Sequence, residues 1–207
     1  DINRTIHVLS RENRNLKGWF EKPVQWKHGK PLHRVVALFR DPHDRRRSEF
    51  FYLTKKLSLT KNNINCCGFI TNSIKTNMVP ILSKNVSTEQ RLHNYLEFVR
   101  PYQGCMTNMI MGRRCFYGTP SPKMVSRAIS FVTNEMEFVG LQEKWNASVK
   151  LWHARFGGVI FDNELTQKRT NTDSSIQNDI LYEDVDIHVY RAAVKRFEKD
   201  FTIVTRL

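Results

Sequence analysis

The sequence predicts a mixed α/β protein in which helices flank a parallel sheet. The first observation behind this prediction is a five-residue apolar run, Val35 to Phe39, with charged residues on both sides. Such a run is too short for a helix and is typical of a buried strand in an α/β sheet. The second observation is the alternation of helix, strand and helix that the spacing of apolar residues predicts over 121–156. At 207 residues the chain can bury a proper core, and we expect one domain over residues 1–207.

The residues after the apolar run are candidates for an anion site. Arg40 directly follows the predicted strand, and Asp41-Pro42 ends it, because proline lacks an N–H while Asp41 can cap a following helix. Ligands of open α/β sheets bind outside the carboxyl ends of strands, and helix N-termini attract anions. Arg40 and Ser48 are therefore candidates to converge on a phosphate. The alternative interpretation is a strand, turn and helix with a solvated basic face.

Spacing and end signals predict the other elements in order. Thr5 to Leu9 has strand-like content, and residues 49–59 continue the helix that follows Pro42. Ser87-Thr88-Glu89-Gln90 resembles a capping box and predicts a helix that ends at Pro101. Further predictions are a buried helix in 102–112, a helix from Ser121, a strand at 137–140 and helices over 142–156 and 184–201.

Two of these helices have a predicted apolar side. It consists of Trp145, Val149, Trp152 and Phe156 in the first, and of Ile187, Tyr190, Val194, Phe197 and Phe201 in the last. After the strand at Thr5 to Leu9, the chain up to residue 30 is predicted to be irregular and basic, and residues 60–86 to form a long loop. Residues 163–178 are predicted to form a polar segment, either a mobile loop or a lid over an anion, and contain Lys168 and Arg169.

Charge favours an anionic partner without choosing it. The formal net charge is +13, and residues 1–62 hold 15 Lys and Arg against 6 Asp and Glu, which gives +9. A nucleotide, an acidic glycan, a nucleic acid and an acidic protein surface all fit such a field. No recognised motif supports nucleic-acid binding. No apolar run approaches the length of a membrane span, so we expect membrane contact only through a segment outside this chain.

The cysteines and the N-glycosylation sequons are relevant to the cellular compartment of the protein. The four cysteines lack zinc-ligand spacing, so we expect no metal site. Cys105 and Cys115 can form a disulfide in an oxidising compartment, and reduced, buried thiols are equally acceptable. The sequons that begin at Asn85 and Asn146 are compatible with a secretory lumen.

The segment around Arg40 resembles a known nucleotide-binding motif. Arg40-Asp41-Pro42, Arg45, Ser48 and the aromatic run 50–52 are similar, in register, to the 3′-phosphate-binding segment of sulfotransferases that use 3′-phosphoadenosine 5′-phosphosulfate (PAPS). Three later segments, 102–112, 138–148 and 186–197, resemble in order those of the Golgi carbohydrate group of these enzymes. The resemblance covers residues 33–201.

This resemblance implies a sulfotransferase-like fold, related to that of P-loop NTPases. It implies that Arg40 and Ser48 hold the 3′-phosphate of the nucleotide, and that Lys168 and Arg169 lie in the loop that covers it. The implied reaction moves the sulfonate of PAPS, as co-substrate, to a hydroxyl of a carbohydrate or similar acceptor, without a metal. The implied location is the Golgi or secretory lumen, and the implied partners are the nucleotide and an acidic glycan or protein.

The sequence departs from the family pattern at two places, and these departures suggest an alternative function. The family's 5′-phosphosulfate loop, which precedes the Arg-Asp-Pro strand, is absent, so we expect either an incomplete N-terminal part or a chain that has lost transfer chemistry. A Gly-His pair expected about twenty residues before Arg40 reads Gly18-Trp19 here. Among the upstream histidines His7, His28 and His33, our choice of catalytic base is His7. The alternative function is an inactive, sulfotransferase-like structural or binding subunit of a larger assembly.

Overall fold

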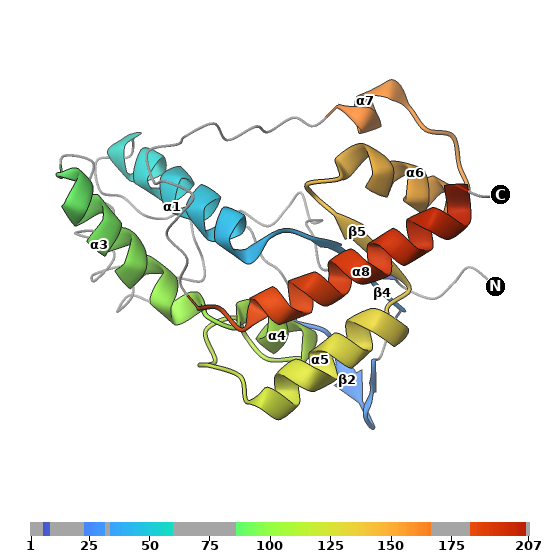
Figure 1. The fold of residues 1–207 in the computed structure, drawn as a ribbon, viewed down its shortest axis with the longest axis horizontal. Helices are drawn as coiled ribbons and strands as arrows, with labels where there is room; N and C mark the ends of the chain where they lie inside the picture. The colour runs from blue at the N-terminus through green and yellow to red at the C-terminus, as the bar shows by residue number, and fades with distance from the viewer. Residues whose placement is uncertain (1–5, 9–22, 32–33, 60–85, 167–182, 206–207) are drawn as a thin grey trace.

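The computed structural model describes residues 6–8, 23–31, 34–59, 86–166 and 183–205 and shows a mixed α/β protein (Figure 1). Its main sheet contains β1 (Ile6–Val8), β4 (Arg34–Phe39) and β5 (Phe138–Leu141), in the order β1-β4-β5. Both strand pairs are parallel, as predicted. Their carboxyl ends therefore lie at one edge of the sheet. The predicted strand at 35–39 is confirmed, with Val35, Val36, Ala37 and Phe39 buried.

A small hairpin and a set of helices complete the described structure. The hairpin pairs β2 (Trp26–Lys27) with β3 (Lys30–Pro31). The helices are α1 (Pro42–Leu59), α3 (Thr88–Val99), the short 3₁₀ helix η1 (Arg100–Tyr102), α4 (Cys105–Ile110), α5 (Pro122–Asn134), α6 (Trp145–Phe156), α7 (Asp162–Leu165) and α8 (Asp186–Thr205). Ser87 and Ser121 cap α3 and α5 as expected, because their hydroxyls accept backbone N–H groups of the first turns.

The core lies between the sheet and the helices α5 and α8. Phe131 and Val132 of α5 are fully buried, and so are Val139 of β5 and Ala193 of α8. Figure 1 shows α8 running across the molecule beside α5 and β5. The face of α8 that is buried deepest consists of Asp186, Val189, Ala193 and Phe197. The predicted apolar side is confirmed for Phe197, and Tyr190, Val194 and Phe201 are partly buried against the core. The deepest contacts of the first turns lie one position earlier, at Val189 and Ala193.

In α6, Trp152 and Phe156 of the predicted apolar side pack against the core, as expected. Its fully buried residues are Ser148 and Leu151, whereas Trp145, Val149, Trp152 and Phe156 are only partly buried. The rings of Trp152 and Phe156 pack against Phe138, with centroid distances of 5.1 and 6.1 Å. The helix ends at Gly157, as predicted, where φ is +80°.

Two buried acidic residues at the start of α8 hold α4 in place. The Gly104 N–H donates to Asp184 Oδ1 (2.9 Å), and the N–H groups of Met106 and Thr107 donate to Asp186 (2.6 and 2.8 Å). The Thr107 hydroxyl donates to the same carboxylate at 2.7 Å. Burial, and then the neighbouring Asp184, raise the pKa of Asp186 to about 6, while the hydrogen bonds from Thr107 and Met106 oppose this shift.

The predicted burial of the segment 102–112 is confirmed for α4, all six residues of which are buried. Cys105, its first residue, forms a disulfide with Cys115. The bond links the connection between α4 and α5, which contains Cys115, to the first residue of α4. Of the two thiol states that the sequence allows, the structure has the oxidised one.

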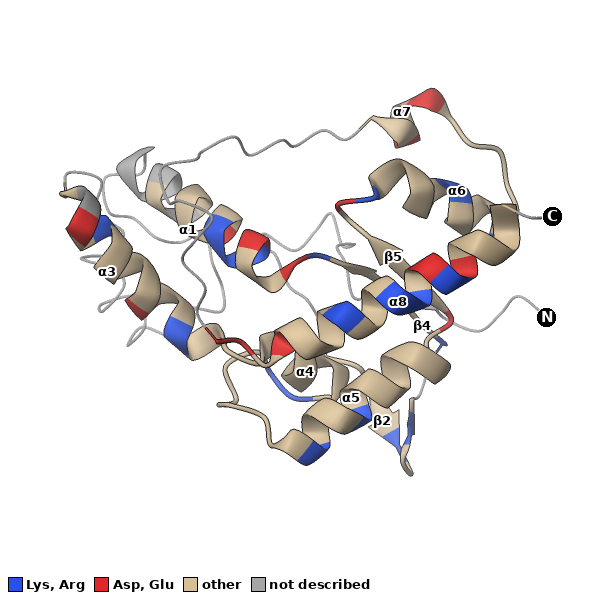
Figure 2. Ribbon diagram, in the orientation of Figure 1, with Lys and Arg blue, Asp and Glu red and all other residues tan. Residues whose placement is uncertain are grey.

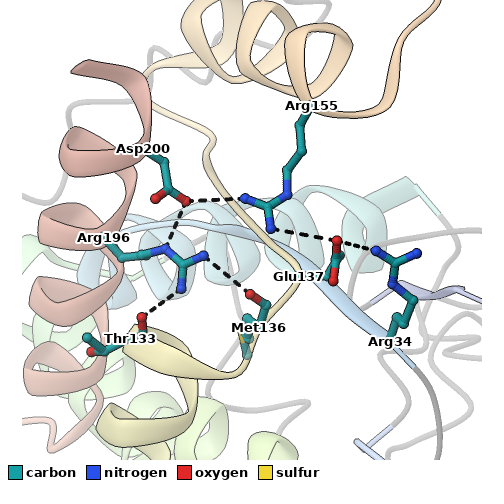
Figure 3. A network of polar contacts seen from close by, with 7 residues as sticks. All are labelled: Arg34, Thr133, Met136, Glu137, Arg155, Arg196 and Asp200. Carbon is teal, nitrogen blue, oxygen red and sulfur yellow. Dashed lines mark hydrogen bonds and ion pairs between the residues drawn. The ribbon is translucent and has the colours of Figure 1, made fainter. Parts of the chain in front are cut away.

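A chain of alternating charges joins the opposite edge of the sheet to two helices (Figure 3). Arg34 at the start of β4 pairs with Glu137, which also lies 3.6 Å from Arg155 of α6. Arg155 lies 3.9 Å from Asp200 of α8, and Asp200 accepts from Arg196 Nε at 2.8 Å. The Arg34 guanidinium holds the pKa of Glu137 below its usual value. The network ties β4, β5, α6 and α8 together at the amino ends of the strands.

Several predicted segments lie outside the described residues. These are residues 10–22 of the irregular segment, the loop at 60–85 and residues 167–178 of the polar segment. The prediction of irregular chain up to residue 30 is wrong at its end, because β2 and β3 pair there as a hairpin around the turn at His28-Gly29. The described start of the polar segment forms the short helix α7 rather than a loop. Its Glu164 accepts the Phe161 N–H at 2.8 Å, which explains why a polar sequence is helical here.

Candidate functional site

Arg40 lies at the carboxyl edge of the sheet, immediately after β4. The register pairs Phe39 with Leu141, so the turns after β4 and β5 are neighbours. The Gln142 N–H donates to the Phe39 carbonyl at 2.7 Å and extends this pairing beyond β5. The sequence-based expectation that Arg40 stands where α/β sheets bind ligands is therefore met by its position.

The Arg40 side chain is partly buried, and no described acid forms an ion pair with it. Burial lowers the pKa of its guanidinium, Asp44 and Glu143 act against this shift, and Arg45 and Arg47 reinforce it. Within the described part of the chain, Arg40 forms no hydrogen bond and no ion pair. A cation that is partly withdrawn from water, with acids acting on it only at longer range, favours the binding of an anion.

The first turn of α1 is already capped. Asp41 Oδ1 accepts the N–H groups of His43 (2.9 Å) and Asp44 (3.2 Å), and the Asp41 carbonyl accepts the Arg45 N–H at 2.9 Å. The helix N-terminus therefore has these amides occupied by its own N-cap carboxylate. An anion beside Arg40 would be held by side chains, and the part of the prediction that used the helix N-terminus is not supported by this arrangement.

Ser48 lies on the same helix, on a side that faces away from the core. Pro42, Arg46 and Phe50 are buried at i, i+4 spacing and define the core side of α1. Ser48 lies about 160° around the helix from Arg46 and is three residues after Arg45, so Arg45 and Ser48 share a face. Ser48 is partly exposed. Arg40 and Ser48 thus bracket the first two turns of one element, about 9 Å of helix.

Two of the neighbouring arginines are committed to protein partners. Arg47 pairs with Asp44. Arg46 has only 3% of its side chain exposed, pairs with Glu49 at 2.8 Å and places its guanidinium carbon 4.4 Å from the ring centroid of Tyr102. Arg46 is not among the residues predicted from sequence, although its spacing from Pro42 and Phe50 indicates the buried stripe. It joins α1 to η1 and does not belong to an anion site.

Glu143 and Tyr190 join the Arg40 turn to the rest of the molecule. The Glu143 carboxylate accepts the Asp41 N–H at 2.7 Å and forms a hydrogen bond with the Tyr190 side chain. Burial, and then the Glu143 charge, hold the pKa of Tyr190 well above its usual value. Neither residue was predicted as part of the site, because no local signal shows that the turn after β5 and the first turns of α8 meet beside Asp41.

The structure places His7 away from Arg40. Its backbone pairs with Val35, five residues before Arg40 along the parallel register, which corresponds to about 16 Å of strand. The side chain of His7, and both Lys168 and Arg169, lie outside what the structure describes. Arg40 and Ser48 are therefore the two predicted site residues whose side chains the structure places, and it does not bring His7 to the edge where they lie.

Within the described residues, no three His, Cys, Asp or Glu side chains gather as a metal-ion site would require. None of the helices in that part of the chain has the length and apolar character needed to cross a membrane.

The fold and the site define a mixed α/β protein with a partly buried arginine at the carboxyl edge of a parallel sheet. No protein-family model, curated protein or solved structure matches the chain.

Proposed function

We propose that this chain is a PAPS-dependent sulfotransferase domain in which Arg40 and Ser48 hold the 3′-phosphate of the nucleotide. The observation that carries the proposal is the environment of Arg40: a partly buried cation after a central parallel strand, without a hydrogen bond or ion pair from the described residues. The ordered sequence resemblance over residues 33–201 supports the same function. A guanidinium supplies forked, charge-assisted donors to a phosphate, and a hydroxyl adds one more.

In the proposed reaction a hydroxyl of a carbohydrate or similar acceptor attacks the sulfur of PAPS. A new S–O bond forms, the bond from sulfur to the bridging phosphate oxygen breaks, and adenosine 3′,5′-bisphosphate leaves. The acceptor proton goes to a base, for which His7 is the residue proposed from sequence. Arg40 and Ser48 would orient the nucleotide and take no proton. Lys168 and Arg169 are proposed to cover it.

The Cys105–Cys115 disulfide and the two sequons support a Golgi or secretory location, since disulfides persist in oxidising compartments. Asn146 is exposed near the start of α6 and is one of the two candidate glycosylation sites.

Binding of adenosine 3′,5′-bisphosphate to the full chain, measured by isothermal titration calorimetry, tests the nucleotide site. We expect Arg40→Ala to weaken binding by about 1.5–3 kcal/mol, the scale of a lost charged hydrogen bond, which is roughly 10- to 150-fold in Kd. The matched control is Arg100→Ala, because Arg100 is 72% exposed and pairs only at the surface with Glu97. Absence of binding, or equal affinity in wild type and Arg40→Ala, would reject the assignment.

A second candidate function is an inactive, sulfotransferase-like binding subunit. It is favoured by residues 1–33, which lack the phosphosulfate-loop pattern and the Gly-His pair of the family. Transfer of labelled sulfonate from PAPS to a panel of carbohydrate acceptors separates the two. Nucleotide binding with no transfer by the full chain would favour the subunit, whereas turnover that Arg40→Ala abolishes would favour the enzyme.

A further inference from the structure

A second cationic region lies on elements that do not contribute to the Arg40 site. The ranges 23–31 and 100–134 contain no Asp or Glu. Together they contribute seven Lys and Arg, namely Lys27, Lys30, Arg100, Arg113, Arg114, Lys123 and Arg127. Figure 2 shows the blue segments of β2, of α5 and of the connection after α4 gathered at the lower end of the view. An acid-free stretch of this length in a chain with 20 Asp and Glu concentrates positive charge at one end.

Trp26 is the residue at which these segments meet. Its Nε1–H donates to the Ile110 carbonyl at 2.9 Å, and its ring centroid lies 5.0 Å from that of Phe131. The Arg127 guanidinium carbon lies 5.3 Å from the Trp26 ring centroid. A Cβ atom on Gly112 would lie 2.9 Å from the Trp26 ring, so the backbone just before Arg113 passes directly against it. The hairpin, the end of α4 and α5 therefore present their cations from one packed unit.

The hairpin holds two like charges face to face. Lys27 and Lys30 are directly paired across the strands, on either side of a tight turn at His28-Gly29, where φ is +50° and +75°. Like charges in such a pair destabilise a two-stranded ribbon. Both lysines are exposed, and no acid among the described residues pairs with either. Such a pair costs folding stability, and a bound anion would offset the repulsion.

The connection after α4 presents two more cations on a constrained backbone. Arg113 and Arg114 are exposed and lie between Gly112 and the disulfide-bonded Cys115. The buried Asn108 holds both ends of this connection, because its carbonyl accepts the Arg113 N–H (2.8 Å) and its side-chain amide donates to the Gly118 carbonyl (2.7 Å). The preorganised backbone lowers the entropic cost of binding a ligand there.

The cations of this region differ in whether they form ion pairs. Arg100 pairs with Glu97 and Arg127 with Glu135. By contrast, the described residues give no ion pair to Lys27, Lys30, Arg113, Arg114 or Lys123, and the Arg113 guanidinium carbon lies 5.0 Å from the ring centroid of Tyr117. We call these five residues, which have no ion pair with a described acid, the hairpin surface.

We propose that the hairpin surface binds an acidic polysaccharide, through its sulfate or carboxylate groups, at a place separate from the Arg40 site. Separate Lys and Arg side chains on the hairpin, on the connection after α4 and on α5 suit a polymer with regularly spaced anionic groups. A disulfide constrains Arg113 and Arg114, and disulfides persist in oxidising compartments, where the abundant polyanions are glycans rather than nucleic acids. Insertion into a lipid bilayer needs adjacent apolar side chains, and within these segments Tyr117 is the one exposed large hydrophobic residue described.

Binding of the full chain to heparin, as a sulfated polysaccharide probe, tests this proposal by surface plasmon resonance and by calorimetry. The variants are Lys27→Gln with Lys30→Gln, and Arg113→Gln with Arg114→Gln. The matched control is Lys195→Gln with Lys199→Gln, which removes the same charge from exposed positions of α8. We expect each hairpin-surface pair to weaken heparin binding about tenfold and the control pair less than about twofold.

Two further readouts sharpen the test. The affinity of the wild type for heparin should fall as the salt concentration rises. A variant that combines all four substitutions to Gln should show a weaker salt dependence. The Lys27 and Lys30 substitutions should not lower Tm, because they remove a repulsive pair, so weaker binding cannot be attributed to unfolding. Arg40→Ala should leave heparin binding unchanged, so failure of the nucleotide site and failure of this surface are separate results.

Equal heparin affinity in the hairpin-surface and control variants would overturn the proposal. Duplex DNA of matched charge that competes for the hairpin surface as well as heparin does would also overturn it, in favour of nucleic-acid binding.

Discussion

The hydroxyl of Ser148 satisfies both backbone polar groups of Leu141. It donates to the Leu141 carbonyl and accepts the Leu141 N–H, each at 2.8 Å, and Ser148 has 3% of its surface exposed. Leu141 is the last residue of β5, where the sheet ends and the turn toward α6 begins. One side chain therefore completes the strand at the edge that carries the candidate site.

Ser148→Ala should lower the free energy of unfolding by about 1–3 kcal/mol, because it removes the hydroxyl that the buried Leu141 N–H donates to, while the Leu141 carbonyl keeps the Lys144 N–H at 3.2 Å. Urea denaturation measures the effect. Thr202→Ala is the matched control, since the exposed Thr202 hydroxyl donates only to the Glu198 carbonyl of its own helix. Equal losses in both variants would show that the buried contact adds nothing beyond an ordinary helix-surface hydrogen bond.

Arg196→Met should lower the free energy of unfolding by about 1.5–3 kcal/mol. The guanidinium donates to the Thr133 carbonyl at 2.6 Å and to Asp200 at 2.8 Å, and it joins the end of α5 to α8 (Figure 3). Thermal and urea unfolding measure the change. Arg127→Met, which breaks an exposed pair with Glu135, should cost less than about 1 kcal/mol. A loss as small for Arg196 would mean that the network of Figure 3 contributes only as a surface ion pair.

Stability should depend on the buried pair Asp184 and Asp186 between pH 4 and pH 6. The folded-state pKa of Asp186 is raised to about 6, so the folded protein binds a proton more tightly than the unfolded chain. The stabilising contribution is then fully present below the unfolded pKa of 3.8 and is lost as pH rises through about 6.

Asp184→Asn removes the like charge while keeping an oxygen for the Gly104 N–H. It should flatten this pH dependence by about 1–2 kcal/mol between pH 4 and pH 7, as measured by urea denaturation at each pH. Asp162→Asn, at an exposed position in α7, is the control. Parallel curves for wild type and Asp184→Asn would contradict the coupling of the two carboxylates.

Glu143 should act on nucleotide binding through both its charge and its hydrogen bond. Glu143→Gln keeps an acceptor for the Asp41 N–H but removes a negative charge that acts on Arg40, so affinity for adenosine 3′,5′-bisphosphate should rise about two- to fivefold. Glu143→Ala also loses the bond to the turn, so its affinity should fall below that of Glu143→Gln. Calorimetric titration compares the two, and identical affinities would show that the hydrogen bond does not position the Arg40 turn.

The sequence by itself determined those elements whose cause is local. The apolar run before Arg40 became β4, Ser87 and Ser121 capped the helices they precede, and Asp41 both ended the strand and capped α1. These features follow from side-chain polarity and from hydrogen bonds between residues a few positions apart. The position of Arg40 at a strand end was predicted for the same reason.

Only the tertiary structure decided which charges are free and which are used. Within the run Arg45-Arg46-Arg47 the sequence shows three equivalent cations, yet packing buries Arg46 against the ring of Tyr102 in η1. Glu143, Tyr190 and the junction at Trp26 likewise depend on segments far apart in sequence. The physical reason is that the cost of burying a charge, and the counter-charge that offsets it, are set by neighbours that only folding brings together.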